Sequence, residues 1–210
     1  MSSLNTLAAQ ISLYPTGPSE DSAFIRFVNA STAPLDVIAQ EGQAPLRLEA
    51  TKPVSLFFPV QASSPIKGTL VSGQQNLPLE LRVEPGEFAT VVALPDGTNG
   101  LKQVTVREQP DDFNGLKASL AFLSLDPACA DASLRPAGRT ADLFKAVPDG
   151  TLQRRSINPV SLSVQLVCAN ANVGSALDLG ELKAGERYSV LLLPSAAGPR
   201  LLNVTDSLSH

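Results

Sequence analysis

The chain has 210 residues, enough for one large domain or for two domains of about 100 residues each. It carries 16 basic and 20 acidic residues, and the formal net charge of -4 gives no general attraction to nucleic acid or anionic lipid. Hydrophobic residues make up 43% and charged residues 17%, the composition of a folded protein. The only histidine is His210, which excludes most histidine-based catalysis and metal binding.

The first half of the chain has the pattern of short strands separated by turns. Residues 1–22 are polar and rich in proline and glycine, which predicts an extended arm. Runs of β-favouring residues then alternate with Pro, Gly, Asn and Asp, at the spacing typical of a β-sandwich over residues 23–107. The predicted strands are Phe24–Val28, Leu35–Ile38, Val54–Phe58, Thr69–Val71, Leu77–Val83, Phe88–Leu94 and Leu101–Val106.

Residues 108–117 are polar and predict a linker, after which the pattern restarts and fills residues 118–210. Three segments match in the same order in both halves: 23–28 with 118–123, 52–56 with 158–162, and 83–95 with 182–194. The sequence therefore predicts an all-β protein of two tandem antiparallel β-sandwich domains, produced by internal duplication. The alternative is that two unrelated β domains share turn and strand composition. In the last match, Gly86 and Gly185 stand where a turn is expected to need a positive φ.

The two cysteines, Cys129 and Cys168, lack the close spacing of a zinc site. An even count in a small β-rich chain suggests one disulfide, formed in an oxidising compartment. Two buried free thiols in a cytoplasmic protein are the alternative. No signal-peptide pattern follows Met1, so a cytoplasmic protein and the mature form of an exported one both remain open.

The second half contains a longer, basic segment between Leu134 and Ile157. This segment could form a patch that meets an anionic partner or polymer, and the alternative is a solvated long hairpin without such a role. Its basic residues are Arg135, Arg139, Lys145, Arg154 and Arg155.

No catalytic site is expected from the sequence. A serine or cysteine nucleophile needs a base within hydrogen-bond reach, and His210 stands at the end of the chain. Residues 206–210 contain aspartate, serine and histidine, but we expect a terminal tail not to hold them rigidly. The chain has no GxSxG, P-loop or strand-linked GxGxxG motif. We therefore expect a protein that is not an enzyme and needs no cofactor or metal.

One stretch resembles a known family. Residues 13–30 read LYPTGPSEDSAFIRFVNA, which resembles the start of mature AlgF-type proteins, periplasmic accessory proteins of bacterial exopolysaccharide O-acetylation. That family shows Leu-Tyr, then Pro/Gly-rich residues, then a Ser-x-Phe-x-Arg-x-x-Asn strand, and its tandem β layout and length are similar. The resemblance implies a periplasmic location. It also makes Tyr14, Arg26 and Asn29 candidate partner-binding residues; the alternative is that they are an anchoring aromatic, an exposed strand residue and a turn former.

The resemblance further implies a non-catalytic adapter. In such systems a membrane-bound O-acyltransferase exports acetyl groups, and periplasmic SGNH-type O-acetyltransferases place them on the polymer, alginate or cellulose. The AlgF-type protein is thought to link the two, and the exopolysaccharide itself is a further candidate partner. Two alternatives stay open: a protein that carries acetyl on a serine or on Cys168, and a module that binds an anionic polysaccharide.

Overall fold

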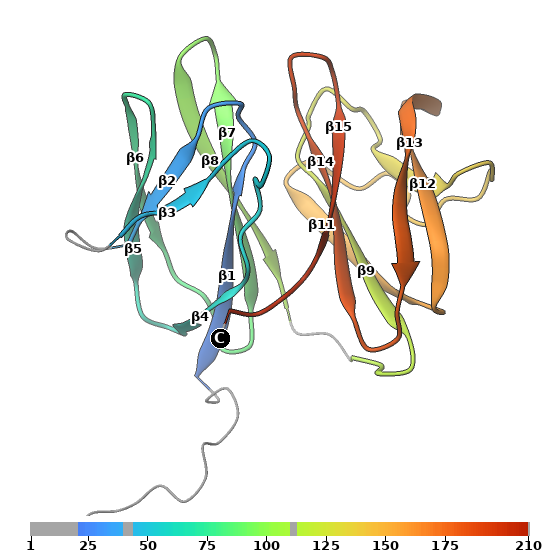
Figure 1. Cartoon of the computed structure of the whole chain (residues 1–210), viewed down its shortest axis with the longest axis horizontal. Helices are drawn as coiled ribbons and strands as arrows, with labels where there is room; N and C mark the ends of the chain where they lie inside the picture. Colours follow the sequence, from blue (N-terminus) through green and yellow to red (C-terminus); the bar gives the residue numbers. More distant parts are fainter. Residues whose placement is uncertain (1–20, 40–43, 110–112, 210) are drawn as a thin grey trace, which may run out of the picture.

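The computed structural model describes residues 21–39, 44–109 and 113–209, and every regular element in these ranges is a β-strand. The strands form four sheets, which pair into two sandwiches that stand side by side (Figure 1). The predicted all-β fold of sandwich domains is confirmed. The predicted arm over residues 1–22 lies outside the described residues up to residue 20.

The first sandwich consists of β1 (Ser22–Asn29), β2 (Leu35–Ile38), β3 (Leu46–Leu48), β4 (Phe58–Gln61), β5 (Ile66–Ser72), β6 (Gln75–Leu81), β7 (Phe88–Asp96) and β8 (Gly100–Glu108). Its inner sheet has the order β4-β1-β7-β8, and its outer sheet has the order β3-β2-β5-β6. Alternate residues of β1, among them Ile25 and Phe27, pack between the two sheets against Leu70 of β5. The 2.0-residue period of a strand places these side chains on one face.

The second sandwich consists of β9 (Ala118–Ser124), β10 (Ser133–Pro136), β11 (Thr151–Ile157), β12 (Val160–Cys168), β13 (Ala171–Leu182), β14 (Arg187–Leu193) and β15 (Arg200–Thr205). Its inner sheet has the order β11-β9-β14-β15, and its outer sheet has the order β10-β12-β13. Leu120 and Phe122 of β9 pack here against Leu134 and Leu166 of the outer sheet.

The strand predicted over Val54–Phe58 is wrong in its position. Only single contacts tie this segment to β1, such as the bridge between Val54 and Val28, and the regular strand β4 begins at Phe58. The segment does not continue the ladder with β1 because the Phe57 N–H donates instead to the carbonyl of Ser207, at 2.9 Å, in the C-terminal segment. The segment therefore makes single contacts with β1 and with the C-terminal residues, and it forms no continuous ladder with either.

The inner sheets of the two sandwiches have equivalent registers. Phe24 of β1 lies opposite Phe88 of the parallel strand β7, and Ser119 of β9 lies opposite Arg187 of β14. These four positions are related by the first and third of the matches found in the sequence. The equivalence supports an internal duplication.

The second match, between residues 52–56 and 158–162, does not relate equivalent positions. The first of these segments runs beside β1 in the inner sheet, where the carbonyl of Pro53 accepts the Asn29 N–H at 2.8 Å. The second segment leads into β12 of the outer sheet. The shared Pro-Val-Ser-Leu is therefore a coincidence of strand composition.

The duplicated turns before β7 and β14 each need a glycine. Gly86 and Gly185 have φ angles of 78° and 79°, as the sequence predicted. A Cβ on Gly185 would meet only the Gly115 carbonyl at 3.5 Å, an ordinary contact, so the cost of a side chain comes from the backbone. We expect Gly185→Ala to lower the free energy of unfolding by about 1 kcal/mol, measured by urea denaturation.

Gly115→Ala is the matched control for this substitution. Gly115 lies in the linker with open space at its Cβ position and no positive φ, so its replacement should leave stability nearly unchanged. Equal losses in the two variants would show that the left-handed backbone at Gly185 is not the cause.

The two inner sheets pack face to face through a separate hydrophobic cluster, which we call the interdomain core. The first sandwich contributes Val28, Ala30, Val92, Leu94 and Val106, and the second contributes Ala121, Leu123, Leu125, Leu191 and Leu193. The central inner strands therefore bury both faces, and all seven residues of β9 are buried. Near-continuous apolar runs are the sequence pattern of such strands.

Candidate functional site

A group of charged side chains lies at one end of the interdomain core, where segments of both sandwiches meet. Arg26 of β1 donates to Asp206 Oδ1 at 2.7 Å, and Arg154 of β11 donates to Asp206 Oδ2 at 3.0 Å. Arg154 also pairs with Glu108 of β8, which Arg187 of β14 contacts at 3.3 Å. We call these five residues the buried charge network.

The two residues at the centre of the network, Arg26 and Asp206, have buried side chains that are well supplied with hydrogen bonds. The side chains of Arg26 and Asp206 are only 3% and 5% exposed. The Arg26 Nε donates to Thr90 Oγ1 at 2.9 Å, its Nη2 donates to Ser189 Oγ at 3.0 Å, and Ser189 Oγ donates to Asp206 at 2.8 Å. The Arg26 guanidinium also lies 4.5 Å from the centre of the Phe57 ring. Pairing of this kind is what makes a buried charge tolerable.

Asp206 and Arg26 form a charged pair at the centre of the network. Burial alone would raise the pKa of Asp206, but the charges of Arg26 and Arg154 and the Ser189 hydroxyl lower it by more, so it stays below its ordinary value. Burial lowers the pKa of Arg26, against the opposing effect of Asp206, but a guanidinium is so basic that it keeps its charge. The geometry therefore suits a clamp between the sandwiches.

The C-terminal segment brings Asp206 to its place. After β15 the chain crosses to the first sandwich (Figure 1), where Ser209 N–H donates to the Phe57 carbonyl at 2.8 Å. Leu208 forms a parallel bridge with Phe57. The expectation that residues 206–210 form a loose tail is therefore wrong for the described residues up to Ser209. Backbone pairing with the segment before β4 holds them.

Two of the three candidate partner-binding residues contact their own chain. Arg26 is 2% exposed, so its interpretation as an exposed strand residue is wrong. Asn29 is fully buried: its Oδ1 accepts the Ser31 N–H at 3.0 Å, and its Nδ2 donates to the carbonyls of Ala33 at 2.8 Å and Leu48 at 3.1 Å. Tyr14 lies outside the described residues.

The basic segment of the second sandwich does not form a patch of five free cations. Arg154 belongs to the buried charge network, Arg135 pairs with Asp142 at 2.9 Å, and Arg155 donates to the Leu143 carbonyl at 2.8 Å. Successive residues of β11 point to opposite faces, which separates Arg154 from Arg155. Arg139 and Lys145 are exposed.

The structure joins Cys129 to Cys168 in a disulfide that closes a sequence separation of 39. The bond ties the turn after β9 to the end of β12 in the outer sheet. A bonded sulfur offers no thiolate, so in this form Cys168 is not an acyl acceptor.

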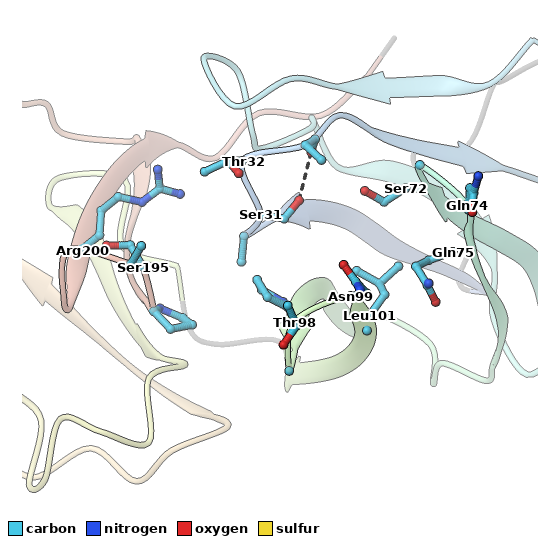
Figure 2. Close-up of a pocket in the computed structure, with 18 residues that line it drawn as sticks. Ser31, Thr32, Ser72, Gln74, Gln75, Thr98, Asn99, Leu101, Ser195 and Arg200 are labelled. Atoms are coloured by element: carbon cyan, nitrogen blue, oxygen red, sulfur yellow. Dashed lines mark hydrogen bonds between the residues drawn. The ribbon is translucent and has the colours of Figure 1, made fainter.

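At the other end of the inner strands, loops of both sandwiches surround an open pocket of about 830 Å³ (Figure 2). Its polar lining comes from four connections: Ser31 and Thr32 after β1, Ser72, Gln74 and Gln75 at the β5–β6 turn, Thr98 and Asn99 between β7 and β8, and Ser195 after β14 with Arg200 at the start of β15. Sequence reasoning did not find this site, because its residues come from four distant segments and form no local motif.

The described ranges contain no group of three or more His, Cys, Asp or Glu side chains placed to hold a metal ion. In those same ranges we find no helix of the length and apolarity that crossing a membrane requires.

Comparison with known proteins finds no matching family model and no matching curated protein. Among solved structures, the C-terminal domain of AlgF from P. aeruginosa is 24% identical over 43% of this chain and 98% of its own length, with a TM-score of 0.36. A protein proposed to act in cell adhesion, from Bacteroides uniformis, is 9% identical over 90% of this chain and 99% of its own length, with a TM-score of 0.31. The AlgF domain belongs to the family that residues 13–30 resemble, but likenesses this weak carry no argument about function.

Proposed function

We propose that this chain is a non-catalytic accessory protein of exopolysaccharide O-acetylation, of the alginate type. In this proposal it works in the periplasm as an adapter that links a membrane-bound O-acyltransferase to SGNH-type O-acetyltransferases. The observation that carries the proposal is the resemblance of residues 13–30 to the start of AlgF-type proteins.

The structure gives the strand part of that resemblance a physical meaning. Phe24 stacks on Phe88 with ring centroids 4.7 Å apart, Arg26 enters the buried charge network, and Asn29 fixes the loop after β1. These residues of the Ser-x-Phe-x-Arg-x-x-Asn strand thus build the inner sheet and the contact between the sandwiches. A chain that shares this strand is expected to share the two-sandwich body, which supports common architecture with the family.

Two further features suit the proposed role. The interdomain core and the buried charge network join the sandwiches through their inner sheets, so both outer sheets remain on the outside (Figure 1). Such a body can hold two partners at a fixed separation. The Cys129–Cys168 disulfide suits an oxidising compartment such as the periplasm.

The proposal is tested in cells that make an O-acetylated exopolysaccharide. Deletion of the gene should abolish acetylation of the polymer, measured as ester content, and leave polymer synthesis intact. The tagged chain should co-purify with an SGNH-type O-acetyltransferase, and the purified chain alone should transfer no acetyl from an ester donor to the polymer. Normal acetylation after deletion, or turnover by the purified chain, would contradict the proposal.

A pair of variants sharpens the co-purification. Tyr14→Ala should reduce recovery of the O-acetyltransferase, because Tyr14 lies in the segment that carries the resemblance. Leu116→Ala is the control, since Leu116 is 83% exposed in the linker and distant in sequence from that segment. Equal recovery with Tyr14→Ala and Leu116→Ala would remove Tyr14 as a partner contact.

A further inference from the structure

We propose that the pocket between the loops of the two sandwiches binds a carboxylate-bearing saccharide, with Arg200 receiving the carboxylate. This inference goes beyond the proposed function, because an adapter needs no ligand in this pocket. It also uses a different part of the molecule from the basic segment of the second sandwich.

Arg200 is the reason to expect an anion. It is the one charged side chain among the described residues that line the pocket, on a chain whose net charge is -4. Its Nε is enclosed by the protein and has no hydrogen-bond partner in the described part of the chain, so a ligand in the pocket would meet the two terminal nitrogens of the guanidinium. The guanidinium carries a positive charge, and the described lining residues supply no carboxylate to balance it. An anion from outside the chain would provide that counter-charge.

The other arginines that join the sandwiches make a direct contrast. Arg26 and Arg154 each reach a carboxylate of this chain, and their side chains are only 3% and 7% exposed. Arg200 stands where β15 begins, at the end of the second inner sheet opposite to Asp206, and Figure 2 shows its side chain directed toward Thr32 across the pocket. The chain therefore satisfies its interdomain arginines internally at one end and leaves one for a ligand at the other.

The remaining walls indicate what else the ligand carries. Hydroxyls of Thr32 and Thr98 and amides of Gln75 and Asn99 offer both donors and acceptors, and no aromatic ring is among the described lining residues. Sugar hydroxyls match such groups, while a guanidinium binds a carboxylate with two parallel hydrogen bonds. The volume of about 830 Å³ suits a short oligosaccharide better than a bare inorganic anion.

Two walls are held in place without a ligand. Asn29 accepts the Ser31 N–H at 3.0 Å, which fixes the loop after β1. Ser195 Oγ donates to the Gly198 carbonyl at 2.6 Å, which closes the hairpin that presents Arg200. Because these loops are already ordered, binding loses less conformational freedom.

The test is a titration of the purified full chain with a tri-uronate, followed by calorimetry and by amide chemical shifts. We expect the trimer to bind and to shift the amide signals of Ser31, Thr98 and Asn99. Arg200→Gln should weaken binding by about tenfold or more, the loss expected for a charged hydrogen-bond pair. Arg139→Gln, the same change at an exposed arginine outside the pocket, should leave it unchanged.

Two matched ligands decide the chemistry. The same trimer with its carboxylates reduced to alcohols should bind at least about tenfold more weakly, for the same reason. Inorganic phosphate should also bind more weakly than the tri-uronate. The inference is overturned if the wild-type chain does not bind the trimer, if Arg200→Gln binds it as well as Arg139→Gln does, or if phosphate or the reduced trimer binds equally well. None of these outcomes bears on co-purification with the O-acetyltransferase.

Discussion

Replacing Asp206 with asparagine is expected to lower the free energy of unfolding by about 3–5 kcal/mol, measured by urea denaturation at pH 7. The substitution keeps the shape of the side chain and removes its charge. Arg26 and Arg154 then stay buried without the carboxylate that they share at 2.7 and 3.0 Å. A buried charge that loses its partner is far more costly than an exposed one, because water cannot replace the lost interaction.

Asp36→Asn provides the matched control. Asp36 pairs with Arg47 on the surface, where the two side chains are 27% and 55% exposed, so its loss should cost less than about 1 kcal/mol. A similar small loss for Asp206→Asn would show that the buried charge network does not hold the sandwiches together.

Wild type and Asp206→Asn are also expected to differ in how the free energy of unfolding depends on pH. The pKa of Asp206 is lowered in the folded protein, so its contribution is fully present above the unfolded value of about 3.9 and is lost as pH falls through the folded value. The wild-type chain should therefore lose stability below about pH 4. The difference between wild type and Asp206→Asn should shrink as pH falls from about 4 through the folded value, because protonation of Asp206 leaves both chains with an uncharged side chain there. A difference that stays constant down to pH 2 would contradict this assignment.

The sequence predicted well those strands whose pattern depends only on contacts within one sandwich. Alternation and turn residues located β7 and β8, and the Gly-Glu turns at Gly86 and Gly185 were found with their positive φ angles. These features depend on neighbours within a few residues, and local pattern is sufficient to detect them. The first and third matches between the two halves were visible for the same reason.

The contact between the sandwiches could not be predicted in this way. In an isolated sandwich the side of β1 that carries Arg26 would face water, which is why an exposed position was the natural interpretation. The second sandwich covers that side, and Asp206 arrives from 180 positions along the chain. A signal did exist, since β1 and β9 carry apolar residues on both faces, as strands buried on both sides do. Nothing local, however, marks Asp206 or Arg200 as partners of this surface.

The disulfide gives the second large effect. Replacing Cys129 and Cys168 together with alanine is expected to lower the free energy of unfolding by about 4 kcal/mol, because the unfolded chain is released from a closed loop of about 40 residues. Urea denaturation of the variant and of the wild type, each with and without dithiothreitol, measures the loss.

The reductant separates the bond from the substituted side chains. Wild-type protein should lose a similar amount of stability in dithiothreitol, while the alanine variant should not respond, since it has no bond to break. If the wild type is equally stable with and without reductant after the thiols are shown to be free, the bond does not stabilise the fold. The argument from stability to an oxidising compartment would then fall as well. If the loss is found, protein that folds in a reducing compartment would be less stable by the same free energy of unfolding. The chain would then depend on export to an oxidising compartment for its full stability.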